Sequence, residues 1–453
     1  MTTTRTTEAL ASWIATVPRD RTARAAAPAM AGMRDAIGCI LAGAGEETPR
    51  RVAAAATRWG AGAARIIGDG RALPSPWAAL VNGTAAHVLD YDDTFGPLSG
   101  HATAVLVPAI LALGEERSAS GPALLDALVV GLEVLAAIGR GVNPQHYALG
   151  WHATSTIGAI GAAAACARLL CLDARATQDA LSLAVSMAAG TRMQLGAMAK
   201  SVHAGLAAKA GILAATLAAE GVGGAAEALE GPWRFAEMFA GQPAPEGAMA
   251  PPAPDAPLAI EAEGLAFKAY PTCAATHLSL DALLALRPRF AAEQVAAIET
   301  DLPLVLSRNL MHPDPCTGMQ ARFSMQYCLA VAAAQGSVGP ADFEGAALSR
   351  ETVRRLMPRI SMRGLPEADG VPPPQTTVRV RLTDGQVLQE TRSIRRGSPG
   401  NPMSEAEQLT KFRDCAARIL SPARVTAAEA AIAGLATGGS ARDLVALLVP
   451  DAA

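Results

Sequence analysis

The sequence predicts a mainly α protein, with a large all-helical domain built from both chain ends and a smaller α+β domain inserted as a lid. Alanine, the best helix former and a poor strand former, makes up more than a fifth of the 453 residues. Alanine is about half as dense between residues 263 and 404 as elsewhere, and strand-like patterns appear there. We therefore predict a helical domain at 1–262, a lid domain at 263–404 and a return to the helical domain at 405–453.

The first part of the chain is predicted to be one helix after another. Apolar residues recur there at helical spacing between Gly, Pro and Asp breaks. The run 157–172 (IGAIGAAAACARLLCL) is apolar on almost every side, so it must be buried among other helices. A stretch rich in Pro and Ala, 242–258, is typical of an extended linker. The expected helices span 8–16, 23–45, 48–60, 76–91, 103–117, 122–141, 152–170, 175–190, 199–221 and 224–240.

The middle of the chain mixes strands and helices. Val378 and Val380 alternate with Arg379 and Arg381, and Asp384-Gly385 then predicts a type I′ hairpin turn. Strand-like segments lie at 294–306, 358–363 and 375–395, and helical runs at 274–287, 320–336 and 350–357. After 404 the helices resume, because Ser404 to Glu407 and Thr426 to Glu429 both have the capping-box pattern.

Charge and cysteine content exclude several classes of protein. There are 38 Lys and Arg against 41 Asp and Glu, so no cationic surplus predicts binding to nucleic acid or to an anionic membrane. The most apolar segments are interrupted by Asp126, Glu133 and Arg168, so we expect no membrane span. Seven unpaired-looking cysteines and the lack of a signal-peptide pattern favour the cytoplasm.

Cofactor motifs are weak throughout the sequence. The Gly-rich segments lack the preceding strand and the spacing of a dinucleotide or phosphate loop, and no pair of His or Cys residues has zinc spacing. Only the carboxylates between Asp90 and Asp93 could hold a magnesium ion. We therefore expect no metal and no organic cofactor.

Histidines and a few charges at the starts of apolar helices are the candidates for chemistry. His101, His152 and His277 each precede or open such a helix, where backbone N–H groups favour anions. Lys200 and His203 lie three residues apart on one face of an apolar helix. A lysine buried there is costly unless it meets a negative charge, which a polyanionic ligand would supply.

Helical spacing also places Asp90 and Asp93 on one side, where a raised pKa would suit a reacting carboxyl group. Other polar residues are expected to be structural. His87 precedes the Asp pair on an apolar face, Asp92 is expected to be a cap or a surface group, and His146 and His312 lie in Pro-containing loops. A helical binding protein without catalysis is the alternative, and it would leave these histidines scattered in space.

Six segments together resemble the MmgE/PrpD family, in the right order and over nearly the whole chain. Members of this family include 2-methylcitrate dehydratase, cis-aconitate decarboxylase and iminodisuccinate epimerase. The segments are HVLDYDDTF with GHATAVLVPAILALGE (87–116), GWHATSTIGAIGAAAACARLLCLD (150–173), GTRMQLGAMAKSVHAGLAAKAGILAATLAAEGVGG (190–224), KAYPTCAATHLSLDAL (268–283), PDPCTGMQARFSMQYCLA (313–330) and VRVRLTDG with GSPGNPMSEAEQLTKF (378–412).

The resemblance implies a homodimer whose active site lies between the helical domain and the lid and uses no metal or organic cofactor. It places the catalytic positions on Asp93, His101, His152, Lys200 and His277. Substrate binding is assigned to Lys268, Arg322, Thr94 and His203. The family's reactions share a carbanion next to a carboxylate, which needs cations together with an acid and a base near working pH.

Two departures from the family pattern bear on the substrate. His101 is followed by Ala-Thr where Pro-Ser is common, and Ala274-Ala275 stands where an aromatic or basic residue is common. The smaller, less basic wall favours a dicarboxylate, or a different substituent, over 2-methylcitrate. We predict a lyase, either a dehydratase or a decarboxylase, acting on a small di- or tricarboxylic acid. The alternative is an epimerase of an amino- or imino-dicarboxylic acid such as iminodisuccinate.

Overall fold

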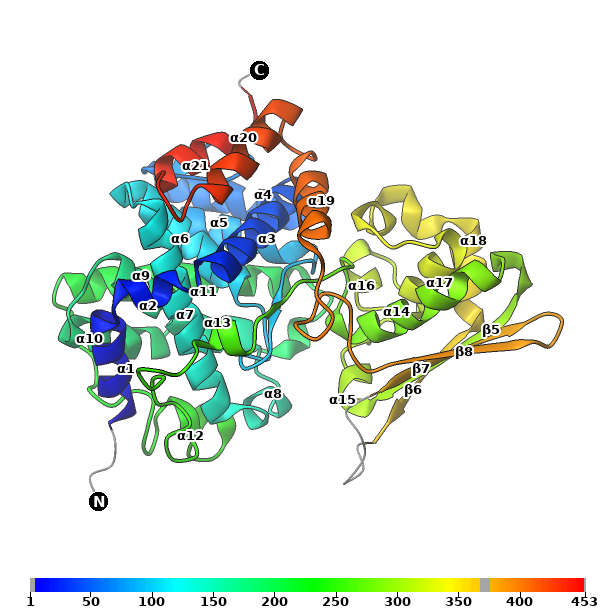
Figure 1. Ribbon diagram of the computed structural model, residues 1–453, viewed down its shortest axis with the longest axis horizontal. Helices are drawn as coiled ribbons and strands as arrows, with labels where there is room; N and C mark the ends of the chain where they lie inside the picture. The colour runs from blue at the N-terminus through cyan, green and yellow to red at the C-terminus, as the bar shows by residue number, and fades with distance from the viewer. Residues whose placement is uncertain (1–4, 367–374, 452–453) are drawn as a thin grey trace.

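The computed structural model describes residues 5–366 and 375–451, and these residues form two large buried apolar cores. The larger core contains residues from 10–265 and again from 412–448, and the smaller one contains residues from 270–388. Figure 1 shows the larger, helical part beside a smaller part that carries the main sheet. The mainly α class is therefore confirmed. Residues 1–4, 367–374 and 452–453 of the predicted domains lie outside the described residues.

Long apolar helices form the centre of the larger part. Helices α7 (Gly121–Val142), α9 (Ala153–Leu169) and α11 (Met198–Ala219) are buried over much of their length, as the lack of a polar face predicted. The other helices before residue 263 are α1 (Thr6–Thr16), α2 (Arg19–Ala23), α3 (Ala26–Ala44), α4 (Glu47–Ala56), α5 (Ser75–Val88), α6 (Thr103–Arg117), α8 (Gln145–Ala148), α10 (Ala174–Val185), α12 (Phe235–Ala240) and α13 (Ala259–Ala262).

Two glycines let α5 and α11 pack backbone against backbone. A Cβ added at Gly205 of α11 would lie 2.1 Å from the carbonyl oxygen of Leu80, and one added at Gly83 of α5 would lie 2.7 Å from the Cα of Gly205. Neither position has room for a side chain. This close approach brings the first turn of α11, which carries Lys200, beside the end of α5, which precedes Asp90.

The C-terminal helices pack back on the first part of the chain. Helix α19 (Glu405–Ala416) contacts α3 (Ala26–Ala44), and α21 (Ala441–Leu447) contacts α6 (Thr103–Arg117). The capping box from Ser404 to Glu407 is confirmed at the start of α19. The one predicted from Thr426 is wrong, because α20 (Pro422–Ala433) begins four residues earlier and the Thr426 hydroxyl donates to the Pro422 carbonyl within that helix.

The smaller part is a four-stranded sheet with helices packed on it. The strand order is β6-β5-β7-β8, with β5 (Val295–Pro303) parallel to β6 (Ile360–Leu365) and antiparallel to β7 (Thr376–Leu382), which pairs with β8 (Val387–Arg392). Its helices are α14 (His277–Leu286), α15 (Leu304–Ser307), α16 (Gly318–Ala321), α17 (Met325–Gln335) and α18 (Glu351–Leu356). Figure 1 shows α14 and α17 lying along this sheet.

The β7–β8 hairpin is present, but its turn is not of the I′ type. A type I′ turn needs positive φ at both central residues, and of Asp384 and Gly385 only Gly385 has one, at +89°. The Gly385 N–H donates to the Leu382 carbonyl, and the Leu382 N–H donates to the Gln386 backbone carbonyl. The loop is therefore longer than the two residues predicted.

A short antiparallel ladder lies where the chain passes from the larger part to the smaller one. Strand β3 (Thr94–Phe95) pairs with β4 (Leu265–Ala266), and the segment after β8 runs back toward α19. Thr94 and Phe95 of β3 line the cavity described below, together with residues that come from both parts of the chain.

Two of the described helices, α7 and α11, are long and apolar enough to cross a membrane by length and composition alone. The most apolar 18-residue windows of these helices are 89% and 61% buried inside the protein. Buried core helices of globular proteins meet the same criterion, so the observation is weak support for a membrane span.

Candidate active site

A cavity of about 340 Å³ lies where the two parts of the molecule meet, and we call it the central cavity. It brings together five of the nine residues predicted for the site, which are Thr94, His101, His152, Lys200 and Lys268. Asp90, which the sequence analysis paired with Asp93, lines the cavity as well. Asp90 and Lys268, which are 178 positions apart in the sequence, therefore share one cavity.

Asp90 joins two of the lysines at the wall of this cavity. Its carboxylate accepts a hydrogen bond from Lys200 and lies 3.1 Å from the Lys268 ammonium, which also donates to the Asp90 carbonyl at 2.8 Å. Burial alone would raise the pKa of this carboxyl group, but the two ammonium groups hold the pKa well below its usual value. Asp90 is therefore a permanent anion between two cations.

The backbone at Asp90 explains its position. Helix α5 ends at Val88, and Asp90 has φ of +52°, a left-handed conformation that is rare outside glycine. The chain turns there, so Asp90 and Asp93 do not share a helix face. The helical spacing used in the sequence analysis does not apply, because no helix continues through these residues.

Asp93 lies behind the cavity wall and is not part of its lining. Its carboxyl group is fully buried and accepts hydrogen bonds from the backbone N–H and the hydroxyl of Thr103, which starts α6. Burial raises the pKa of Asp93 to about 7. The structure thus places Asp90, and not Asp93, next to Lys200.

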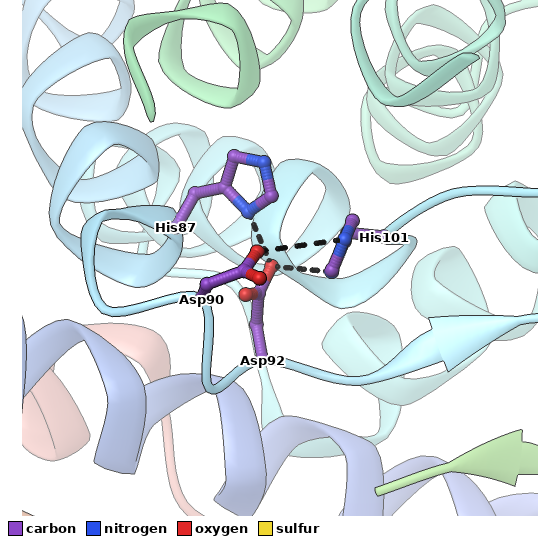
Figure 2. Close-up of side chains that lie close together, drawn as sticks. All are labelled: His87, Asp90, Asp92 and His101. Carbon is purple, nitrogen blue, oxygen red and sulfur yellow. Dashed lines mark hydrogen bonds and ion pairs between the residues drawn. The ribbon is translucent and has the colours of Figure 1, made fainter. Parts of the chain in front are cut away.

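Asp92 connects two histidines, as Figure 2 shows. Its Oδ2 atom is 2.7 Å from His87 Nδ1 and 3.1 Å from His101 Nδ1. Asp92 and His87 are fully buried, whereas His101 is 13% exposed and lines the cavity. The expectation that Asp92 is a cap or a surface group is wrong, because this carboxylate orients the ring of His101.

The surroundings keep these two imidazoles neutral. Burial lowers the pKa of His87 to about 3, with Lys200 adding to the effect and Asp92 opposing it. Burial also lowers the pKa of His101, and Lys268 and Lys200 act in the same direction. His101 and His87 in turn hold the pKa of Asp92 well below its usual value, because both rings stabilise the charge of this carboxylate. His101 is thus a neutral imidazole held by an anion on its far side.

His152 lines the central cavity, and His203 lies behind it. The two Nδ1 atoms are 3.0 Å apart, and His203 contributes to a separate hollow on the other side. His152 therefore lies between His203 and the central cavity, so His203 does not contact a ligand there directly. Burial, His87 and Lys200 hold the pKa of His152 well below its usual value.

Two arginines that the sequence analysis missed also line the central cavity. Arg192 donates to the Tyr147 carbonyl at 2.8 Å and to the Asn309 side chain, and its Nε atom is buried without a partner. Arg395 donates to the hydroxyl of Thr94. Four cations and one carboxylate thus line the cavity, so with neutral imidazoles the lining carries a net charge of +3. Ala274 and Ala275 line it too, but the wall is not poor in positive charge.

His277 and Arg322 lie outside the lining of the central cavity. His277 is 1% exposed, contacts the edge of the Tyr270 ring and places Nε2 3.3 Å from the Thr272 carbonyl. Arg322 lies over the Phe343 ring and lines a different hollow, with its Nε and Nη2 atoms buried and unpartnered. Neither side chain is therefore in position to contact a ligand in the central cavity directly.

Four donors in this site are close enough together for a metal ion. One ligand atom from each of His87, Asp90, Asp92 and His101 lies within 4.8 Å of the others, as Figure 2 shows. The donor set does not favour a divalent ion, however. Asp90 is already paired with Lys200 and Lys268, whose ammonium groups would repel a dication. The predicted absence of a metal stays a prediction.

His146 supplies a test of the electrostatics away from the cavity. It is buried, contrary to the expectation of a solvated loop, and its Nε2 is 2.8 Å from the Thr156 hydroxyl. Burial lowers its pKa to about 4 from 6.5, so between these values the unfolded chain binds a proton that the folded protein does not. This histidine therefore lowers stability as pH falls below about 6.5.

We expect His146→Gln to lessen the acid sensitivity of the fold. The free energy of unfolding of the wild type should fall from pH 7 to pH 4.5, and the variant should lose about 2 kcal/mol less over this interval. Urea unfolding at the two pH values measures the difference. An equal loss in both proteins would show that His146 titrates normally.

The fold and the site together define a two-part helical protein with an acid–base cavity that is rich in cations. The chain belongs to the MmgE/PrpD family: it matches the MmgE/PrpD N-terminal domain over residues 8–248 and the MmgE/PrpD C-terminal domain over residues 270–436. The family and the names of its relatives indicate a lyase.

Curated relatives carry one activity in their names. The chain is 30% identical to the cis-aconitate decarboxylases of Mus musculus and Homo sapiens, over 77% of its own length and 73% and 74% of theirs. It is 26% identical to a cis-aconitate decarboxylase-like protein of Aspergillus oryzae, over 84% of each chain.

Proposed function

We propose that this protein is a carboxy-lyase that removes carbon dioxide from a small tricarboxylic acid of the cis-aconitate type without a metal or an organic cofactor. The observation that carries the proposal is the cavity lining, whose net charge of +3 matches a substrate with three carboxylates. The names of the relatives support the same substrate class.

The cations hold the substrate and spread the charge that develops on it. Arg192 and Arg395, on opposite parts of the molecule, bind the carboxylates that remain in the product. Lys200, fixed by Asp90, lies next to the carbon that becomes negative. When the bond to the departing carboxylate breaks, its electron pair stays on that carbon, next to a retained carboxylate, where an ammonium group stabilises it.

A proton from the protein then completes the reaction. His152 lines the cavity as a neutral imidazole and supplies the proton that forms the new C–H bond. His101, whose Nδ1 faces Asp92, presents Nε2 toward Asp90 at 4.0 Å, and because its proton is on Nδ1 this Nε2 accepts a hydrogen bond at the substrate. Thr94 fixes Arg395. Asp93 and His277 do not line the cavity, so neither contacts the substrate in this proposal.

The reaction is tested with the purified protein, a panel of citrate-like and amino-dicarboxylic acids, and deuterated water. We expect one acid of the cis-aconitate type to lose 44 mass units as carbon dioxide and to gain one deuterium, and the rate to be unchanged by EDTA. Loss of water would identify a dehydratase. Uptake of deuterium without loss of mass would identify an epimerase. Both results would overturn the proposal.

The homodimer implied by the resemblance is a separate proposal. Light scattering of the purified protein across a range of concentrations measures its mass, and a value of twice 46.2 kDa is expected.

A further inference from the structure

The imidazole pair His152 and His203 separates two cavities. His152 lines the central cavity, and His203 lines a second cavity of about 440 Å³ on the outer side of α11. The second cavity reaches the surface, because its lining includes Leu206, which is 45% exposed, and Ala189, which is also exposed. The hydrogen bond between the two Nδ1 atoms, 3.0 Å long, is thus a direct link from the central cavity to water outside it.

Only one proton can lie between the two Nδ1 atoms, and the surroundings decide which ring carries it. His152 is more deeply enclosed than His203 and faces Lys200, His87 and His101, whereas His203 faces Lys200 and His152. Positive charge is therefore disfavoured more strongly on His152, so this ring carries a single proton. We place the shared proton on His203 Nδ1, because the proton of His152 is then on Nε2, the nitrogen that is free of the His203 hydrogen bond and that the proposed function requires to protonate the substrate.

A neutral imidazole is a very weak acid unless its other nitrogen gains a proton at the same time. His152 can give its Nε2 proton to a carbanion only if Nδ1 receives one, and His203 is the only group hydrogen-bonded to that nitrogen among the described residues. A carboxylate plays the corresponding part in many enzymes, where it fixes the tautomer of a catalytic histidine. Here another histidine occupies that place.

We propose that His203 is a positioning residue that transfers its Nδ1 proton to His152 while His152 protonates the substrate, with water in the second cavity restoring the proton at His203 Nε2. The inference rests on the proposed function, because decarboxylation consumes one proton for each carbon dioxide released. After product release, water in the central cavity protonates His152 Nε2, the shared proton returns to His203, and His203 Nε2 releases its proton to the second cavity. Both rings then have their starting tautomers.

Two variants of His203 separate transfer from simple packing. In His203→Gln the amide N–H can still donate a hydrogen bond to His152, but the amide cannot transfer this proton to His152. We therefore expect kcat to fall by about 10²-fold with KM within about twofold. In His203→Ala the second cavity is enlarged, and imidazole in the assay should restore a large part of kcat. Ser155→Ala, which alters the same cavity outside the histidine pair, should keep full activity and not respond to imidazole.

Rates in mixtures of light and heavy water give a second readout. The wild type should show a bowed dependence on the deuterium fraction, because two protons move together, and His203→Gln should show a linear one. The positioning role would be overturned if kcat were unchanged in both His203 variants. It would also be overturned if kcat fell, imidazole did not restore it and the isotope dependence stayed as in the wild type. In both cases the proposal of a decarboxylase would stand. A wild type that decarboxylates none of the panel acids would overturn both proposals.

Discussion

Replacing Lys200 with methionine should lower kcat for decarboxylation by about 10³-fold while the protein stays folded. The methionine keeps most of the apolar stem but removes the ammonium group that donates to Asp90 at the wall of the central cavity. The lost interaction is stronger in the transition state than in the bound substrate, so kcat should fall much more than KM rises. Steady-state kinetics with the acid identified above measure both constants.

Lys209→Met provides the matched control for this variant. Lys209 belongs to the same helix, α11, but its ammonium group lies 3.8 Å from the centre of the Trp77 ring and outside the central cavity. Its replacement should leave kcat within about twofold, since no charge at the site changes. If the two variants lost activity equally, the loss would come from damage to α11 and not from the missing charge at the site.

The second large effect is expected from Asp90→Asn. The change removes the carboxylate that contacts both Lys200 and Lys268, and it leaves their two buried ammonium groups without this shared counter-charge. We expect kcat to fall by at least about 10²-fold, and the free energy of unfolding by about 3 kcal/mol. Kinetics and urea unfolding at pH 7 measure the two effects.

Asp93→Asn distinguishes the two carboxyl groups of the same segment. Asp93 has a pKa of about 7 and accepts its hydrogen bonds from Thr103, which an amide oxygen can also accept. Its replacement should leave kcat within about fivefold. The opposite order, with Asp93→Asn inactive and Asp90→Asn active, would return the catalytic role to the residue that the resemblance suggested.

The helical architecture could be predicted because composition and periodicity report it directly. Runs such as 157–172 have no polar face, and they form buried helices in the structure. The position of His152 at the start of such a helix was also predictable, since α9 begins at the next residue. Turn geometry was less accessible: Asp384-Gly385 and Thr426 both have sequence patterns that tertiary structure overrides.

The site was predicted in part, for a physical reason that differs between residues. Lys200 lies on a long helix whose faces follow from spacing, and His152 directly precedes another one. Asp90 could not be distinguished from Asp93, because Asp90 itself is left-handed and turns the chain away from the helical path. Arg192 and Arg395 belong to irregular segments far apart in sequence, and only the packing of the two parts of the molecule brings them to one cavity.

The contact between Gly83 and Gly205 has a consequence for how this protein can change. Alanine fills most of the surrounding helices, yet one extra methyl group at Gly205 would push α11 outward by colliding with the Leu80 carbonyl. Because Lys200 and His203 both precede that point on the same helix, the displacement would move an ammonium group and an imidazole together. Catalytic alignment in this molecule thus depends on a site that carries no functional group at all.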